Sequence, residues 1–123
     1  MGKKILLVED DNFLRELLAK KLRNEGFEVI EAVDGEQGLQ ETEEKMPDII
    51  LLDLILPGMD GFQFLEKKKE KEKVKEIPVI ILSNLGQREE IEKGLKLGAV
   101  DYMVKAYFSP FEIVDKVKQY LKE

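Results

Sequence analysis

Five short apolar runs recur at fairly even intervals along the chain, and longer segments with helical spacing separate them. Within most runs Ile, Leu and Val follow one another without polar alternation, which is typical of strands buried on both faces of a parallel sheet. The second run is more polar, which predicts an edge strand. The five predicted strands are Lys4–Val8, Glu28–Ala32, Ile49–Leu52, Pro78–Leu82 and Val100–Val104.

The segments between these runs have the start and stop signals of helices. In the first, an apolar stripe formed by Phe13, Leu14, Leu17, Leu18 and Leu22 ends at Gly26. The second begins at Asp34 and runs to about Lys45, the third begins at Asp60, the fourth covers Gln87–Leu97, and Ser109-Pro-Phe-Glu opens the fifth. The Lys- and Glu-rich run Lys67–Lys75 is interpreted as a solvated helix end rich in ion pairs.

Strand and helix therefore alternate five times, with no repeat and no linker. This order predicts an α/β fold with a parallel sheet, helices on both faces and right-handed crossovers. A length of 123 residues fits a single domain, so we expect residues 1–123 to form one unit with no output domain visible.

Composition narrows the chemistry that such a domain can perform. The net charge of −6 argues against direct nucleic-acid binding, which needs a basic surface. The chain contains no Cys and no His, so any site must use carboxylates, Lys, hydroxyl or backbone groups. No signal-peptide pattern and no membrane-length apolar segment is present, which predicts a soluble, cytoplasmic protein without membrane contact.

Polar side chains stand where the predicted strands end. Glu9 and Asp10 close the first strand, Asp53 the third, Ser83 the fourth and Lys105 the fifth. The ends of parallel strands share one edge, and open α/β sheets bind ligands outside that edge where the strand order reverses. If the strand order is 2-1-3-4-5, the reversal lies between the strands that carry the three carboxylates. We therefore expect these groups to converge.

Three carboxylates in one crevice repel one another and need a cation. Oxygen ligands without His or Cys suit Mg²⁺, which takes one or two carboxylates, waters and a phosphate oxygen. Three carboxylates then balance Mg²⁺ and Lys105 in formal charge. Asp53 is the candidate nucleophile for an acyl phosphate, and Ser83 is the candidate donor to a phosphoryl oxygen. Asp11, by contrast, is expected to cap the first helix.

The motifs at these strand ends resemble those of response-regulator receiver domains over essentially the whole chain. The matching segments are Ile-Leu-Leu-Val-Glu9-Asp10-Asp11, Asp53-Leu-Ile-Leu-Pro57-Gly-Met-Asp-Gly61, Ile80-Ile-Leu-Ser83 and Gly98-Ala-Val-Asp-Tyr102-Met-Val-Lys105. The resemblance implies a flavodoxin-like, doubly wound five-stranded parallel sheet of order 2-1-3-4-5, with five helices on two faces.

The resemblance also implies roles for individual residues in a two-component phosphorelay. Asp53 would accept a phosphoryl group from a histidine kinase or phosphotransfer protein, and Lys105 and Ser83 would contact it. Mg²⁺, with Mn²⁺ as the alternative ion, would be held by Glu9, Asp10, Asp53 and the backbone carbonyl of Ile55. Ser83 and Tyr102 would switch the surface of the fourth helix, fifth strand and fifth helix.

A receiver of this kind is a switch that assists its own phosphorylation and dephosphorylation, not an enzyme acting on a substrate. The implied downstream partner is an effector protein that the sequence does not identify. The protein would be a monomer or a phosphorylation-dependent dimer.

Three departures from the family pattern carry expectations of their own. Ala106 stands where most receivers have Pro after a cis peptide, so the Lys105–Ala106 peptide is expected to be trans or strained, because a cis bond there costs ~2.5–4 kcal/mol. Ile55 and Leu85 are apolar where fast-cycling members are polar, which predicts slow self-dephosphorylation. Ile91 and Val100 are apolar where transcription-factor receivers carry charges, which argues against their particular dimer.

Three other functions compete with this interpretation. A magnesium phosphohydrolase with an Asp nucleophile needs a second Asp two residues on, where this chain has Ile55. A flavodoxin-like FMN carrier needs hydroxyls and amides around the phosphate, and Glu9-Asp10-Asp11 would repel it. A receiver that binds a partner without phosphorylation would not need the complete acidic pocket, although Ala106 keeps this alternative open.

Overall fold

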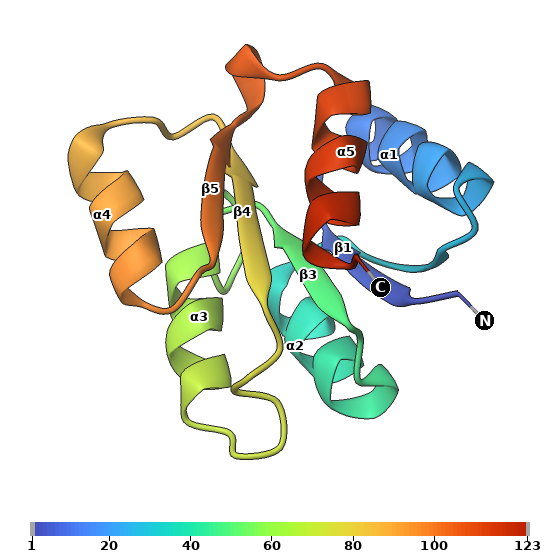
Figure 1. Cartoon of the computed structure of the whole chain (residues 1–123). Coiled ribbons are helices and arrows are strands. Elements are labelled where there is room, and N and C mark those ends of the chain that lie inside the picture. The colour runs from blue at the N-terminus through green and yellow to red at the C-terminus, as the bar shows by residue number, and fades with distance from the viewer. Residues whose placement is uncertain (1, 123) are drawn as a thin grey trace.

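The computed structural model describes residues 2–122, which form five strands and five α-helices in strict alternation (Figure 1). The strands are β1 (Lys4–Val8), β2 (Glu28–Ala32), β3 (Ile49–Leu52), β4 (Val79–Ser83) and β5 (Asp101–Val104). The helices are α1 (Asn12–Asn24), α2 (Gly35–Lys45), α3 (Gly61–Lys69), α4 (Arg88–Lys96) and α5 (Pro110–Tyr120), and the short 3₁₀ helix η1 (Lys105–Tyr107) precedes the last of them.

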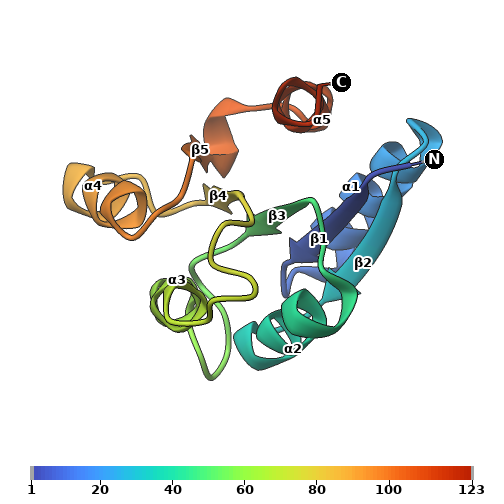
Figure 2. The ribbon, with the colours of Figure 1, turned by 60° about the horizontal axis from the view of Figure 1, so that its bottom comes forward.

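The strands form one parallel sheet in the order β2-β1-β3-β4-β5, which confirms the expected order and the edge position of β2. Helices α1 and α5 cover one face, whereas α2, α3 and α4 cover the other (Figure 2). Successive side chains of a strand point to opposite faces. In β1, Ile5 and Leu7 therefore pack in the core under α1 and α5, while Leu6 and Val8 pack under α2 and α3. Both faces of the sheet are buried, which explains the unbroken apolar runs.

The helix starts carry the polar caps expected from the sequence. The Asp11 carboxylate accepts a hydrogen bond from the Leu14 amide at the start of α1, which confirms its capping role. Reciprocal capping boxes begin α3 at Asp60 and α5 at Ser109.

Two predicted details of the helices are wrong. Phe13 belongs to the apolar stripe predicted for the first helix, but it is 78% exposed because it lies on the side of α1 away from the buried Leu18, Ala19 and Leu22. The basic run after residue 66 is not a solvated helix end throughout, because α3 stops at Lys69 and Lys68 is buried. The Lys68 ammonium donates to the backbone carbonyl of Lys75, and burial lowers its pKa below the ordinary value.

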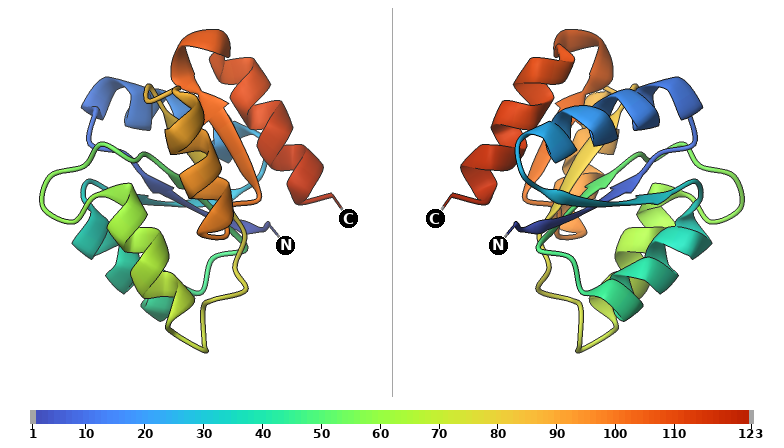
Figure 3. Two further views of the ribbon diagram at one scale, coloured as in Figure 1. Left: turned by 90° about the vertical axis from the view of Figure 1, so that its left-hand side faces the viewer. Right: turned by 90° about the vertical axis from the view of Figure 1, so that its right-hand side faces the viewer.

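The sheet has two chemically different edges. At the amino edge, β1 begins and α5 ends. There the Tyr120 hydroxyl, in the last turn of α5, donates a hydrogen bond of 3.2 Å to the Val100 carbonyl just before β5. At the carboxyl edge all five strands end together, and the loops to the helices leave from there (Figure 3). No helix within residues 2–122 has the length and apolar character needed to cross a membrane.

Candidate functional site

The carboxyl edge of the sheet gathers the polar residues predicted from the strand ends. Val8 pairs with Leu52, so Glu9 and Asp53 leave neighbouring strands at the same level. Ser83 pairs with Val104, which puts the hydroxyl beside the strand that leads into Lys105. The parallel register therefore brings together four groups that are far apart in the sequence.

A lysine bridges two buried carboxylates at the centre of this edge. Lys105 Nζ lies 2.8 Å from Glu9 Oε1 and 2.9 Å from Asp53 Oδ2. The Glu9 and Asp53 side chains are only 2% and 5% exposed, and the lysine side chain is 15% exposed. The other Asp53 oxygen, Oδ1, accepts a hydrogen bond from the Ile55 amide at 3.2 Å. Both oxygens of the proposed phosphoacceptor thus have a donor.

Burial and proximity shift the acid–base properties of this group. Burial, reinforced by the nearby Asp53 carboxylate, raises the pKa of Glu9 above its ordinary value, although the hydrogen bond from Lys105 opposes the change. Burial alone would lower the pKa of Lys105, but its hydrogen bonds to Glu9 and Asp53 outweigh this and the pKa lies above the ordinary value. Lys105 therefore remains a cation at neutral pH.

The acidic pair and Asp53 have the geometry of a divalent cation site. Glu9, Asp10 and Asp53 each offer a carboxylate oxygen, and these oxygens lie within 4.8 Å of one another. Asp10 is exposed, whereas the other two are buried, so the cluster opens to solvent on the Asp10 side. Hard oxygen donors with an open side fit Mg²⁺, which keeps several waters. The residues present therefore suit the ion that the sequence predicts.

The two predicted switch residues meet at one residue of the loop after β4. The Ser83 hydroxyl accepts a hydrogen bond from the Leu85 amide at 3.3 Å, and the Tyr102 hydroxyl donates to the Leu85 carbonyl. Ser83 is fully buried and Tyr102 is half-buried. Burial, with the charges of Glu90 and Asp53, raises the pKa of Tyr102 to about 12. The tyrosine is thus held by a backbone carbonyl of the same loop that contacts Ser83.

The segment after Lys105 follows the expectation drawn from Ala106. No cis peptide occurs in residues 2–122, so the Lys105–Ala106 bond is trans. Lys105–Tyr107 form the 3₁₀ turn η1, after which Ser109 caps α5. Lys105 still reaches the acidic cluster.

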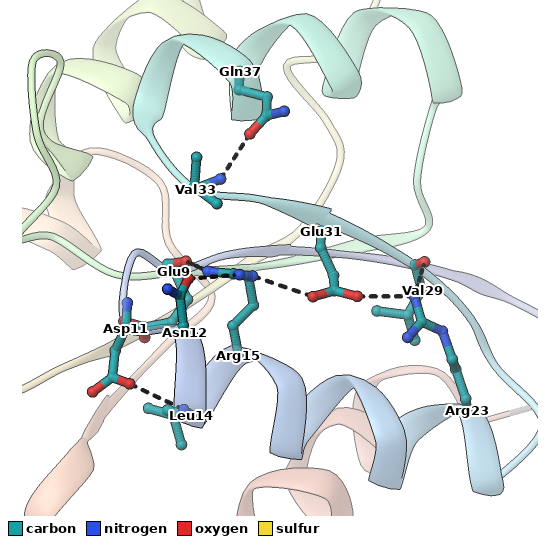
Figure 4. A network of polar contacts seen from close by, with 10 residues as sticks. All are labelled: Glu9, Asp11, Asn12, Leu14, Arg15, Arg23, Val29, Glu31, Val33 and Gln37. Atoms are coloured by element: carbon teal, nitrogen blue, oxygen red, sulfur yellow. Dashed lines mark hydrogen bonds and ion pairs between the residues drawn. The ribbon is translucent and has the colours of Figure 1, made fainter.

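Arg15 also belongs to this edge, although nothing in the sequence pattern distinguishes it from the other basic residues of α1. Its guanidinium is buried and donates to the backbone carbonyl of Glu9, to Asn12 and to Glu31 (Figure 4). Glu31 lies on the neighbouring strand β2 and also accepts from Arg23. Only the folded arrangement shows this connection, because its partners come from three separate elements.

This fold and this acidic edge define a phosphorylation-based signalling domain. The family model "Response regulator receiver domain" matches residues 5–118, and the chain belongs to this family. Receiver domains work in two-component signalling and are signalling domains rather than classical enzymes.

The relatives are response regulators. The chain is 38% identical over 122 residues to the phosphate regulon transcriptional regulatory protein PhoB of Escherichia coli, covering 99% of this chain and 53% of PhoB. It is 40% identical over 124 residues to the alkaline phosphatase synthesis transcriptional regulatory protein PhoP of Bacillus subtilis, covering 99% of this chain and 50% of PhoP. The chain therefore spans about half the length of the curated relatives it matches.

Solved structures of receivers share the fold. A putative response regulator from Chloroflexus aurantiacus superposes with a TM-score of 0.90 at 33% identity, with both chains fully covered. The BeF3-activated DrrB receiver domain gives a TM-score of 0.87 at 31% identity, again covering both chains completely. These similarities confirm the predicted family and the flavodoxin-like architecture.

Proposed function

We propose that residues 1–123 act as one receiver domain that accepts a phosphoryl group on Asp53 from a histidine kinase or a phosphotransfer protein. The observation that carries this proposal is the Lys105 ammonium between Glu9 and Asp53, with the Asp10 carboxylate beside them. The family and its two-component role support the nature of the donor. Because the curated relatives are named as transcriptional regulators, we place the protein in the cytoplasm.

The chemistry follows from the charges at the carboxyl edge. Glu9, Asp10, Asp53 and the backbone carbonyl of Ile55 would hold Mg²⁺, or Mn²⁺ in its place. Bound Mg²⁺ supplies positive charge against the phosphoryl oxygens. An Asp53 oxygen forms the new bond to phosphorus while the bond from phosphorus to the donor breaks, and Lys105 neutralises the opposite side. Positioning and charge neutralisation suffice, so the absence of His from the chain is no obstacle.

The switch acts through Leu85. Movement of Ser83 toward a phosphoryl oxygen on Asp53 exchanges its hydrogen bond from the Leu85 amide for one to the new group. The Leu85 carbonyl is the acceptor for Tyr102, so displacement of this loop changes where the tyrosine rests. A local change of charge thereby biases a two-state element of the fold.

The proposed readout is the surface formed by α4, β5 and α5. Leu95 on α4 and Tyr120 on α5 are 44% and 42% exposed, and Val100 just before β5 is 43% exposed, so this surface presents apolar area to a partner. We propose an effector protein as that partner, with the domain acting as a monomer or as a phosphorylation-dependent dimer. The net charge of −6 argues against direct binding of nucleic acid by this domain.

The direct test is incubation with acetyl phosphate and Mg²⁺ followed by intact mass spectrometry. We expect one added phosphoryl group, which is lost in Asp53→Asn and when Mg²⁺ is chelated. Asp101→Asn is the matched control, because Asp101 is a partly exposed carboxylate on β5 outside the cluster. Its adduct should equal that of the wild type.

The other outcomes separate the competing functions. Continuous release of phosphate from simple phosphate esters would support a hydrolase. An unmodified protein that nevertheless binds partners would support a phosphorylation-independent receiver. A mass increase retained in Asp53→Asn would refute Asp53 as the acceptor.

We further propose that the phosphoryl group on Asp53 is long-lived. Ile55, which is 53% exposed, and Leu85 lie two residues after Asp53 and Ser83, and neither apolar side chain can orient an attacking water by hydrogen bonding. The decay of the mass adduct measures this lifetime, and Ile55→Asn should shorten it. Decay as fast as that of rapid chemotaxis regulators would contradict the proposal.

A further inference from the structure

The buried Arg15 side chain joins the acidic turn after β1 to the edge strand β2 (Figure 4). Its Nη1 donates to the Glu9 backbone carbonyl at 3.0 Å, Nη2 to Asn12 Oδ1 at 2.8 Å, and Nε to Glu31 Oε1 at 3.2 Å. All three nitrogens are therefore engaged, each by a different residue. The planar guanidinium is fixed in one orientation, and it fixes the Glu9 carbonyl in turn.

The Glu9 carbonyl controls the backbone of Asp10. The peptide bond is planar, so the Glu9 carbonyl oxygen and the Asp10 amide nitrogen move as one unit. On the other side of Asp10, the Asp11 amide donates to Glu9 Oε2 at 3.1 Å. Within residues 2–122 no hydrogen bond ends on the Asp10 carboxylate itself. The backbone on its two sides is thus what directs this exposed side chain toward Glu9 and Asp53.

The charge of Arg15 is balanced away from the acidic cluster. Its Nε faces the Glu31 carboxylate, whose other oxygen accepts from Arg23 Nη2 at 3.1 Å. Arg23 Nη2 also donates to the Val29 carbonyl of β2 at 3.1 Å. Arg15 therefore meets the acidic turn through a neutral backbone carbonyl, while its charge is paired with Glu31. It can hold the turn without competing with a cation for the three carboxylates.

We propose that Arg15 is a positioning residue for the divalent cation. By fixing the Glu9–Asp10 peptide, it keeps the Asp10 carboxylate within reach of the Glu9 and Asp53 oxygens, where Mg²⁺ binds. This inference rests on the proposed function insofar as it takes Mg²⁺ to be the ion. Residues that hydrogen-bond to metal ligands, without touching the metal, set the orientation of those ligands. Their loss typically weakens metal binding 10- to 100-fold.

The test is Mg²⁺ titration of the unphosphorylated protein, followed by amide chemical shifts in NMR spectra. Arg15→Met keeps much of the side-chain volume and removes all three donors, and the Mg²⁺ dissociation constant should rise about 10-fold. Arg15→Lys retains a cation able to donate to the Glu9 carbonyl and should recover part of the affinity. A merely structural role would lower thermal stability without this change in binding.

Arg23→Met is the matched control. Arg23 shares the Glu31 carboxylate with Arg15 but has no bond to the acidic turn. Both methionine variants should lose thermal stability, whereas Arg23→Met should bind Mg²⁺ as the wild type does.

The outcomes of these experiments distinguish a failure of this inference from a failure of the proposed function on which it rests. An Arg15→Met variant that binds Mg²⁺ with wild-type affinity overturns the inference and leaves the proposed function standing. A wild-type protein that binds no Mg²⁺ overturns the proposed function and the inference together. If Arg15→Met does not fold, Arg15→Lys compared with Arg23→Lys decides, and equal Mg²⁺ affinities in that pair overturn the inference.

Discussion

Replacement of Lys105 by Met tests whether the lysine is the internal counter-ion of the acidic cluster. The substitution preserves the long unbranched stem and removes the ammonium that bridges Glu9 and Asp53 at 2.8 and 2.9 Å. Two buried carboxylates would then face each other without a cation. We expect the folded state to become less stable and its stability to depend strongly on Mg²⁺.

The magnitude follows from burial. Breaking a buried ion pair by removing one partner costs about 3–5 kcal/mol, because the remaining charge stays desolvated. Glu9 and Asp53 are 2% and 5% exposed, so we expect a loss of about 3–5 kcal/mol in the free energy of unfolding without divalent cations. Mg²⁺ at about ten times its dissociation constant should restore about 1.4 kcal/mol by preferential binding to the folded state.

Urea denaturation followed by circular dichroism measures both quantities, once in EDTA and once in Mg²⁺. Lys71→Met is the control, because its ion pair with Glu43 is exposed on both sides and such pairs contribute about 0–1 kcal/mol. Mg²⁺ should stabilise Lys105→Met more than the wild type, in which the Lys105 ammonium already lies between Glu9 and Asp53. A loss for Lys105→Met no larger than that of Lys71→Met, or a loss that Mg²⁺ leaves unchanged, would refute the reasoning.

Three further predictions concern packing, pH and capping. Gly61→Ala would place a Cβ atom 2.6 Å from the Asp53 backbone carbonyl oxygen, and overpacking of this kind should destabilise the protein by about 1–3 kcal/mol in urea denaturation; an unchanged midpoint would contradict it. The pKa of Tyr102 is raised from 10.0 to about 12. Between these two pH values the tyrosine therefore keeps its proton in the folded protein and loses it in the unfolded protein. The resulting stability is fully present below pH 10 and lost as the pH rises through about 12, and Tyr102→Phe should reduce this alkaline slope of the unfolding free energy. Ser109→Ala removes the hydroxyl that accepts from the Glu112 amide at 3.2 Å and should cost about 1 kcal/mol, visible as a lower melting temperature.

The strands were predictable because burial on both faces leaves a strong local pattern. β1, β2 and β3 have the predicted bounds, and β4 and β5 each begin one residue later than predicted. β4 excludes Pro78, which has no amide to donate to the ladder, and includes Ser83. Helix caps were equally readable, because a side-chain acceptor three residues before its amide is a local feature. The exposure of Phe13 was not predictable, because the apolar residues of this helix spread around more than one side and their spacing does not show which side faces the sheet.

The candidate site also has residues that could be predicted from the sequence and one residue that could not. Glu9, Asp53, Ser83 and Lys105 were predictable because parallel topology brings strand ends together, whatever the sequence distance between them. Arg15 was not, because its significance depends on three acceptors supplied by α1, the end of β1 and the edge strand β2. Residues that act through backbone carbonyls leave no pattern in sequence alone.

The amino edge, where β1 begins and α5 ends, lies opposite the acidic cluster. An affinity tag or a fluorescent reporter joined before β1 or after α5 would therefore lie away from Asp10 and Asp53. The start of β1 and the end of α5 share that edge. A short linker could therefore close the chain into a circle and allow new ends to be cut in a surface loop, because such permutation is tolerated where termini are close. This arrangement makes the domain a practical element for reporters that sense phosphorylation.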